Sequence, residues 1–373
     1  MPSTKVICPE CGSTSQLTPD AFRCPCGGAW EFEERDGFDA SLIDGDDGSL
    51  WRYRRLLGVG IGEQPVRLGA GWTPLLPLPW KNRRILVKPE YLAPTGSFKD
   101  RGTAVMVNIL VGQGVDHIAD DSSGNAGASV AAYAARAGLQ ADIFVPAYAS
   151  PAKQAQIAVY GAWVRPISGP RANAKKAVLH AAEGEITLAS HAYHPGFLLG
   201  QQTVAWEVWE QLGRRAPDWY VVPVGQGVHL LGVWLGFTRL LRAGLVDRLP
   251  RLVGVQPRVL APVARALEAG LETVPEAEAE GHSVAEGMAI ANPVRGRRIL
   301  QALRETGGTC VTVEEEAILE GQRGFAHQGF YAEPTSAAVV AALPTIFDLA
   351  DPDDIIVVPL TGSGLKGAPK TEA

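Results

Sequence analysis

The feature that most constrains the fold is a repeated alternation between short, nearly continuous apolar stretches and segments with a helical period. The apolar stretches include RILVKPE (84–90), ADIFVPA (141–147), DWYVVPVGQG (218–227), RLVGVQP (251–257) and DIIVVPLTGSG (354–364). Strands that are apolar on both faces are typical of parallel sheets covered by helices on either side. The pattern predicts an α/β fold, in which ligands bind beyond the carboxyl ends of the strands.

Length and composition limit the remaining possibilities. The chain has 373 residues, of which 46% are hydrophobic and 20% charged, which suits two well-cored domains and a small appendage. No apolar run reaches the roughly 20 residues of a membrane helix, and the first ten residues contain no export-signal core, so we expect a cytoplasmic protein without membrane contacts. The net charge of −6, with both signs interspersed, argues against nucleic acid as a partner.

Three of the predicted loops carry groups suited to binding an anion or a polar ring. The stretch DDSSGNAGAS (120–129) brings Ser123, Gly124 and Asn125 to the start of a helix, whose free N–H groups attract carboxylates and phosphates. VPVGQGVHLLG places two glycines, Gly225 and Gly227, before another helix. VVPLTGSGLK ends the last strand with neutral hydroxyl groups. Each loop alone is equally compatible with an ordinary strand-to-helix turn.

A lysine stands in an unusual position within APTGSFKDRG (93–102). Lys99 follows a small hydroxyl residue and a phenylalanine where the chain turns into a helix. Desolvation at the base of a cleft makes it easier for a lysine to lose its proton, and the neutral amine can then attack an aldehyde. We therefore interpret Lys99 as a reactive lysine.

Four of the five cysteines lie within the first 26 residues. Cys8 and Cys11 form a C-x2-C pair, and after twelve residues Cys24 and Cys26 form a C-x-C pair. Four thiolates on two tight turns suit structural zinc, with no position left for substrate. The alternatives are a ribbon without metal or a disulfide pair, although disulfides are rare in the cytosol.

The motifs together resemble the pyridoxal-phosphate enzymes of fold type II, the family of tryptophan synthase β-subunits and Ser/Thr dehydratases, and most of all its threonine synthases. The resemblance follows seven motifs in one order over about 300 residues, from GAGWTPLLPL to TGSGLK. It implies two open, mostly parallel sheet domains with the cofactor, pyridoxal 5'-phosphate, in the cleft between them. It also implies a small amino-acid substrate and a homodimer. The predicted parts are a zinc-ribbon-like head (1–35), a linker (36–70), a larger phosphate-binding domain (71–92 and 200–373) and a smaller domain with the Asn loop (93–199).

The resemblance also implies roles for individual residues. Lys99 would attach the cofactor covalently and later move protons on the substrate. Asn125 would contact the ring, and Thr361, or else Ser363, would face its pyridine nitrogen. The cofactor phosphate would be held by main-chain amides of Gly225, Gln226, Gly227, Val228 and His229. The substrate carboxylate would be bound by Ser97, Ser123 and Gly124.

One strip of the sequence departs from the threonine synthase pattern. In HAYHPGFLLGQQT, His194 stands where that family has asparagine, Phe197 and Leu198 where it has an arginine, and Gln202 where it has a lysine. Compensating cations could come from Lys153, Arg101 or Arg165.

The leading prediction is a lyase that converts O-phosphohomoserine to threonine and phosphate. The alternatives are a dehydratase or β-replacement enzyme acting on an amino acid without phosphate, and a cofactor-binding scaffold.

Overall fold

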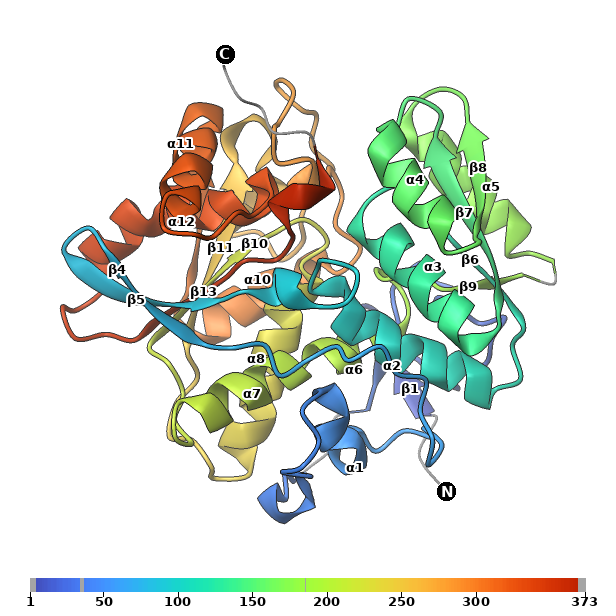
Figure 1. Cartoon of the computed structure of the whole chain (residues 1–373), viewed down its shortest axis with the longest axis horizontal. Helices are drawn as coiled ribbons and strands as arrows, with labels where there is room; N and C mark the ends of the chain where they lie inside the picture. The colour runs from blue at the N-terminus through green and yellow to red at the C-terminus, as the bar shows by residue number, and fades with distance from the viewer. Residues whose placement is uncertain (1–4, 34–36, 185, 368–373) are drawn as a thin grey trace. The chain divides into compact units, whose positions relative to one another are not determined.

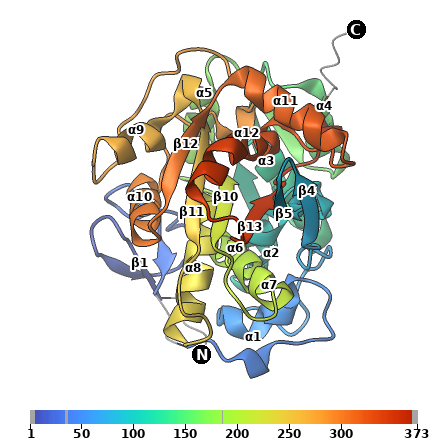
Figure 2. The same ribbon diagram turned by 90° about the vertical axis from the view of Figure 1, so that its left-hand side faces the viewer.

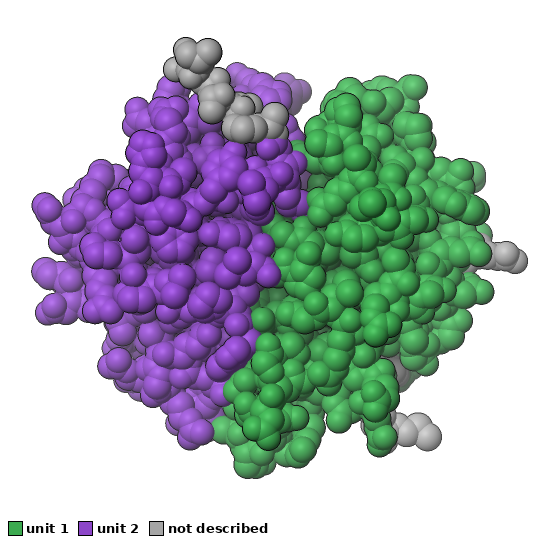
Figure 3. Space-filling model, viewed as in Figure 1, with its two compact units in different colours: residues 1–34, 39–71, 93–201 green, residues 35–38, 72–92, 202–373 purple. Residues whose placement is uncertain are grey.

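The computed structural model describes residues 5–33, 37–184 and 186–367. Their contacts group the chain into two compact units, coloured separately in Figure 3. Unit 1 comprises residues 1–34, 39–71 and 93–201, and unit 2 comprises residues 35–38, 72–92 and 202–373. Each unit therefore draws on segments that are far apart in the sequence.

Unit 1 is built around a parallel sheet of four strands in the order β8-β7-β6-β9. The strands are β6 (His117–Asp120), β7 (Gln140–Pro146), β8 (Trp163–Ile167) and β9 (Thr187–Leu188). The helices are α1 (Arg54–Leu57), α2 (Lys99–Gly112), α3 (Asn125–Ala137), α4 (Pro151–Val159), α5 (Arg171–Ala181) and α6 (Pro195–Gln201).

Helices α3 and α5 cover opposite faces of this sheet (Figure 1). Ala119 of β6 packs in a cluster with Val178 of α5. On β7, Ile143 packs closely against Gly127 of α3. A Cβ atom added to Gly127 would lie 3.1 Å from Cγ2 of Ile143. Ile143 pairs with Asp120, the residue after Ala119. Because successive side chains point to opposite faces, Asp120 shares the face covered by α3.

The first described residues of unit 1 form a separate antiparallel sheet in the order β2-β1-β3. Its strands are β1 (Lys5–Ile7), β2 (Thr14–Gln16) and β3 (Glu31–Phe32). The four clustered cysteines lie in the turns that connect these short strands.

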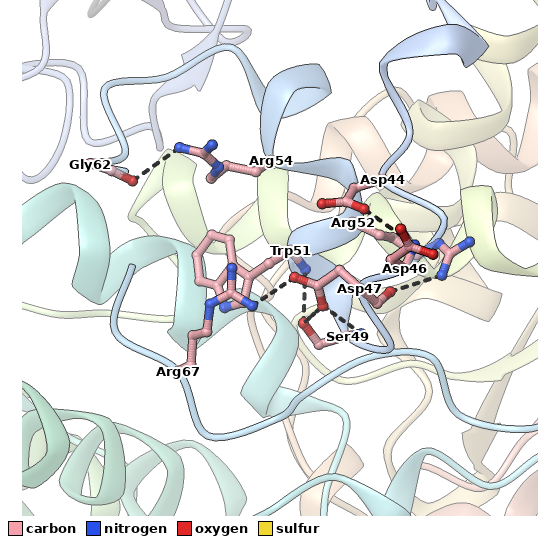
Figure 4. A network of polar contacts seen from close by, with 9 residues as sticks. All are labelled: Asp44, Asp46, Asp47, Ser49, Trp51, Arg52, Arg54, Gly62 and Arg67. Carbon is pink, nitrogen blue, oxygen red and sulfur yellow. Dashed lines mark hydrogen bonds and ion pairs between the residues drawn. The ribbon is translucent and has the colours of Figure 1, made fainter. Parts of the chain in front are cut away.

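Within the segment predicted as a linker, two 3-10 helices (Ala40–Leu42 and Leu50–Tyr53) precede α1. Asp47 organises this part of the chain (Figure 4). Its Oδ1 accepts hydrogen bonds from the backbone N–H and hydroxyl of Ser49 at 2.9 and 2.6 Å, and its Oδ2 pairs with Arg67 at 2.6 Å. Partial burial opposes ionisation, but Ser49 and Arg67 outweigh it and lower the pKa of Asp47.

Unit 2 contains a six-stranded sheet in the order β12-β11-β10-β13-β5-β4, which Figure 2 shows with its covering helices. The strands are β4 (Leu76–Trp80), β5 (Arg83–Lys88), β10 (Trp219–Pro223), β11 (Arg251–Pro257), β12 (Thr309–Val313) and β13 (Ile356–Pro359). Only β4 runs antiparallel to its neighbour. The helices are α7 (Thr203–Gln211), α8 (Val228–Arg242), α9 (Pro262–Glu268), α10 (Gly296–Glu305), α11 (Glu315–Ala326) and α12 (Pro334–Leu349). Short 3-10 helices are Glu90–Leu92, Arg258–Leu260, Glu286–Met288 and Gly364–Lys366.

Both faces of the larger sheet are covered, as the apolar strands predicted. Trp219 and Val221 of β10 belong to the core cluster that includes residues of α12. Between them, the Tyr220 hydroxyl lies 3.3 Å from Nε2 of His229 on α8. Because neighbouring side chains alternate, α12 and α8 lie on opposite faces of the sheet. The predicted α/β class with parallel sheets is confirmed. Among the described residues, no helix is both long and apolar enough to cross a membrane.

A buried ion pair joins β5 to α7 within unit 2. The Lys88 ammonium lies 2.9 Å from a carboxylate oxygen of Glu207, and both side chains are fully buried. Lys88 Nζ also donates to the Thr73 carbonyl at 2.6 Å and to Gln211 at 3.0 Å. The other Glu207 oxygen accepts from the Trp72 N–H at 2.6 Å. This lysine is therefore committed to the structure of the core.

Candidate functional site

Lys99 is the first residue of α2, and a polar network fixes the turn that leads to it. The buried Asp100 carboxylate accepts hydrogen bonds from the Thr95 backbone and hydroxyl, each at 2.7 Å, and from the Ser129 hydroxyl of α3 at 2.6 Å. Lys99 itself is half-buried. Its Nζ lies 4.5 Å from the ring centroid of Phe98 and 5.8 Å from that of Phe197. The amino group therefore lies beside two aromatic rings. The turn before it is hydrogen-bonded to Asp100 of α2, which also bonds Ser129 of α3.

Ser97 lies two residues before Lys99 and offers an unsatisfied hydroxyl. The residue is fully buried, and its Oγ has no hydrogen-bond partner among the described residues. A buried hydroxyl left without a partner costs free energy. A ligand that accepts this hydrogen bond would remove that cost.

The Asn loop connects β6 to α3 in the same unit. The Ser122 backbone N–H donates to Asp120 Oδ2 at 3.2 Å, and the Gly124 N–H donates to Ser122 Oγ at 3.3 Å. Asn125 then begins α3, whose first turn has no side-chain cap. The N-cap residue, Gly124, has no side chain that could cap the helix, and a helix start of this kind attracts anions.

The glycine loop lies between β10 and α8 in unit 2. Gly227 adopts a left-handed conformation with φ of +73°, and a Cβ there would lie 2.3 Å from Ile299 Cδ1. A Cβ on Gly225 would lie 2.7 Å from the Gly287 carbonyl. Only glycine fits at both positions without a shift of the surroundings. Gln226 directs its side-chain oxygen to the Val294 N–H at 3.0 Å, and α8 begins without a side-chain cap.

Thr361 and Ser363 follow β13 in the same unit, and the structure separates their environments. Thr361 is buried, with its hydroxyl 2.9 Å from that of Ser336. Ser363 is half-buried and accepts a hydrogen bond from the Leu365 N–H at the start of a 3-10 helix. Glu333, which precedes α12, lies beside this loop: a Cβ on Gly362 would be 2.3 Å from its Cδ. The Thr361 hydroxyl is therefore held in place by Ser336.

The unusual strip around α6 is largely buried in the structure. Phe197 is fully buried and Leu198 is 3% exposed. His194 accepts a hydrogen bond from the Gly196 N–H at 3.0 Å through Nδ1, so it stabilises the start of α6. Of the proposed compensating cations, Arg165 forms an ion pair with the buried Asp142, and Arg101 is itself fully buried on α2.

Three residues in this region were not predicted as site residues from the sequence. His191 lies within the strip, and Asp120 and Asp121 begin the Asn loop. His191 packs edge-on against Phe197 at 5.9 Å, and its Nδ1 lies 3.9 Å from Asp120 Oδ1. The sequence signal that could have identified Asp120 and Asp121 is their position at the end of an apolar strand. Acidic residues are rarely buried there without a partner.

The four cysteines of the head lie close together. Their sulfur atoms are all within 4.8 Å of one another, with Cys8 and Cys26 at 3.5 Å and Cys11 and Cys24 at 3.6 Å. The residue after each pair closes a tight turn, since the Gly12 and Gly27 N–H groups donate to the Cys8 and Cys24 carbonyls at 2.8 Å. The thiols converge as metal ligands do.

Comparisons with known proteins identify the family of the chain. The family model described as pyridoxal-phosphate dependent enzyme matches residues 66–362. The threonine synthase of Methanocaldococcus jannaschii is 32% identical over 374 residues, which cover 96% of this chain and 92% of the relative. That of Synechocystis sp. is 36% identical over 327 residues, covering 86% and 83%.

Solved structures have the same fold. A threonine deaminase from T.th. superposes with a TM-score of 0.69 and 28% identity, covering 80% of this chain and 94% of that one. Threonine deaminase isoform 2 of Solanum lycopersicum reaches 0.71 at 22% identity, covering 90% and 93%, which supports the fold alone. The chain therefore belongs to the family of pyridoxal-phosphate dependent enzymes, as a threonine synthase-like lyase.

Proposed function

We propose that the chain attaches pyridoxal phosphate at Lys99 and uses it to eliminate or replace the side-chain substituent of an amino acid. The observation that carries this proposal is the position of Lys99, at the start of α2 and beside two aromatic rings. When bound, the cofactor supplies an electron sink for the substrate α-carbon. Lys99 would remove the proton from that carbon and return it later.

The residues present fit the cofactor. In unit 2, main-chain N–H groups of the Gly225–His229 loop would hold its phosphate, because α8 has no side-chain cap and Gln226 points its side chain at Val294. In unit 1, Asn125 would contact the ring. The Thr361 hydroxyl would face the pyridine nitrogen. A neutral hydroxyl cannot keep that nitrogen protonated as a carboxylate does, which favours elimination over transamination.

The substrate carboxylate would be bound in unit 1. Ser97 has the buried hydroxyl without a partner, and Ser123 and Gly124 precede the uncapped end of α3. A carboxylate there would accept hydrogen bonds from the Ser97 hydroxyl and the helix N–H groups. This would place the α-carbon of the substrate next to Lys99.

Two classes of substrate are compatible with this proposal. The names of the curated relatives favour O-phosphohomoserine, the substrate expected of a threonine synthase. The similarity to threonine deaminases and the apolar Phe197 favour an amino acid without phosphate. The expected homodimer and cytoplasmic location remain predictions.

The attachment at Lys99 can be tested by chemical reduction. Borohydride treatment of the yellow holoenzyme is expected to fix a pyridoxyl group on Lys99, identified by peptide mass spectrometry. Lys88 is a matched internal control, because its ion pair with Glu207 occupies it in the core. A label on Lys88 or Lys153 in place of Lys99 would show that the assignment is wrong.

We further propose that Cys8, Cys11, Cys24 and Cys26 bind one structural zinc ion. The three strands of the head are only two or three residues long, so bound metal would supply much of its folding free energy. Metal analysis is expected to find one zinc per chain in the wild type and about none in Cys24→Ser. Cofactor colour should persist in the variant, because the head carries none of the proposed cofactor ligands. Wild-type protein purified without chelators and lacking zinc would contradict the proposal, and Cys310→Ser is the control that should keep its metal.

A further inference from the structure

Three side chains of unit 1 form a connected path away from Lys99. Lys99 Nζ lies 5.8 Å from the Phe197 ring, and that ring lies 5.9 Å edge-on from the His191 ring. His191 Nδ1 in turn lies 3.9 Å from Asp120 Oδ1. The path therefore leads from the reactive amine over an apolar ring to two polar atoms.

These two polar atoms are buried and unsatisfied. Asp120 is fully buried and His191 is 9% exposed. Among the described residues, neither Asp120 Oδ1 nor His191 Nδ1 has a hydrogen-bond partner. At 3.9 Å the two atoms are too far apart to bond directly, but a donor about 2.8 Å from each could bridge them. Since buried polar atoms are normally paired, the arrangement calls for a hydrogen-bond donor.

The Asp120 carboxylate and a neutral His191 do not favour a dianion here. Burial, and then the charge of Lys99, lower the pKa of His191, which favours its neutral form. A phosphate placed next to the Asp120 carboxylate would meet like charge in a buried site, which weakens its binding.

We propose that Asp120 and His191 form a subsite that receives the side-chain end of the amino-acid substrate, and that this end is a hydrogen-bond donor, a hydroxyl or an amine, in place of a phosphate dianion. The proposal rests on the proposed function, because it takes Lys99 as the cofactor lysine. The Phe197 ring lies beneath the intervening methylene groups. Asp120 and His191 thereby select the substrate by the chemistry of its end group.

The test compares three amino acids of equal chain length that differ only in the end group. L-homoserine, L-2,4-diaminobutyrate and O-phospho-L-homoserine are titrated into the holoenzyme, and binding is followed by the change in cofactor absorbance. The hydroxyl and amine compounds are expected to bind at least tenfold more tightly than the phosphate ester. Tightest binding of the phosphate ester would overturn the subsite.

A pair of variants links the preference to Asp120. Asp120→Asn is expected to weaken binding of diaminobutyrate about tenfold and that of the phosphate ester little. Asp116→Asn, an exposed aspartate just before the same strand, should change neither. Equal losses for both ligands in Asp120→Asn would overturn the assignment. If that variant does not fold, the wild-type order of the three ligands decides.

The two proposals fail in different ways. Borohydride labelling of Lys99 combined with tightest binding of the phosphate ester would remove the subsite and leave the proposed function intact. Absence of any label on Lys99 would overturn the proposed function and the subsite together.

Discussion

Replacing Lys99 by alanine is expected to lower kcat/KM by about 10^4 or more, because one change removes both the covalent attachment and the group that moves the proton. A positioned general acid or base alone contributes about 10^2–10^4 in rate. The variant should also lose the absorbance of the attached cofactor, measured by spectroscopy of the purified protein. It should remain folded, since Lys99 is half-buried and its turn is fixed by Asp100.

Lys176→Ala is the matched control, because Lys176 is an exposed lysine on α5 in the same unit. It should keep both colour and turnover. If Lys99→Ala retained more than about a tenth of wild-type activity, Lys99 could not carry the proton transfer assigned to it.

The sequence predicted those parts of the fold that depend on local pattern. Strands apolar on both faces indicated parallel sheets, and β5, β10, β11 and β13 lie where that pattern placed them. The edge strand β4 escaped detection because it contains Pro77 and Pro79, which normally argue against a strand. Proline is tolerated there because an edge strand leaves some of its N–H groups without a ladder partner.

The parts of the site that depend on tertiary contacts could not be predicted. His191 and Asp120 are 71 residues apart, and no local periodicity indicates that they meet. Similarly, the segment predicted as a linker looked acidic and rich in glycine, but the pairing of Asp47 with Arg67 depends on a residue twenty positions away. By contrast, the convergence of the four cysteines was predictable, because C-x2-C and C-x-C spacings define tight turns.

The buried ion pair of unit 2 also combines a predictable residue with an unpredictable partner. Lys88 falls within an apolar strand, where a lysine needs an acidic partner, but Glu207 lies 119 positions away. Two charges at 2.9 Å in a fully buried site are stable only together. The cost of desolvating each is offset by the other and by the bonds to Thr73, Gln211 and Trp72.

Removing one partner of the buried Lys88–Glu207 pair is therefore expected to destabilise the protein more than breaking an exposed ion pair of unit 2. Glu207→Ala should lower the free energy of unfolding by about 3–5 kcal/mol, measured by urea denaturation, because it leaves the Lys88 ammonium buried without its counter-charge. Glu280→Ala is the matched control. Its pair with Arg265 is exposed on both sides, so the loss should stay below about 1 kcal/mol.

The double variant Lys88→Met with Glu207→Leu separates lost attraction from stranded charge. If the cost of Glu207→Ala comes mainly from an uncompensated buried charge, removing both charges with apolar residues of similar size should recover much of the lost stability. If instead the double variant is less stable than Glu207→Ala, the ion pair contributes net attraction beyond its desolvation cost. A loss below about 1 kcal/mol in Glu207→Ala would contradict the burial of Lys88 itself, because water would then reach its ammonium group.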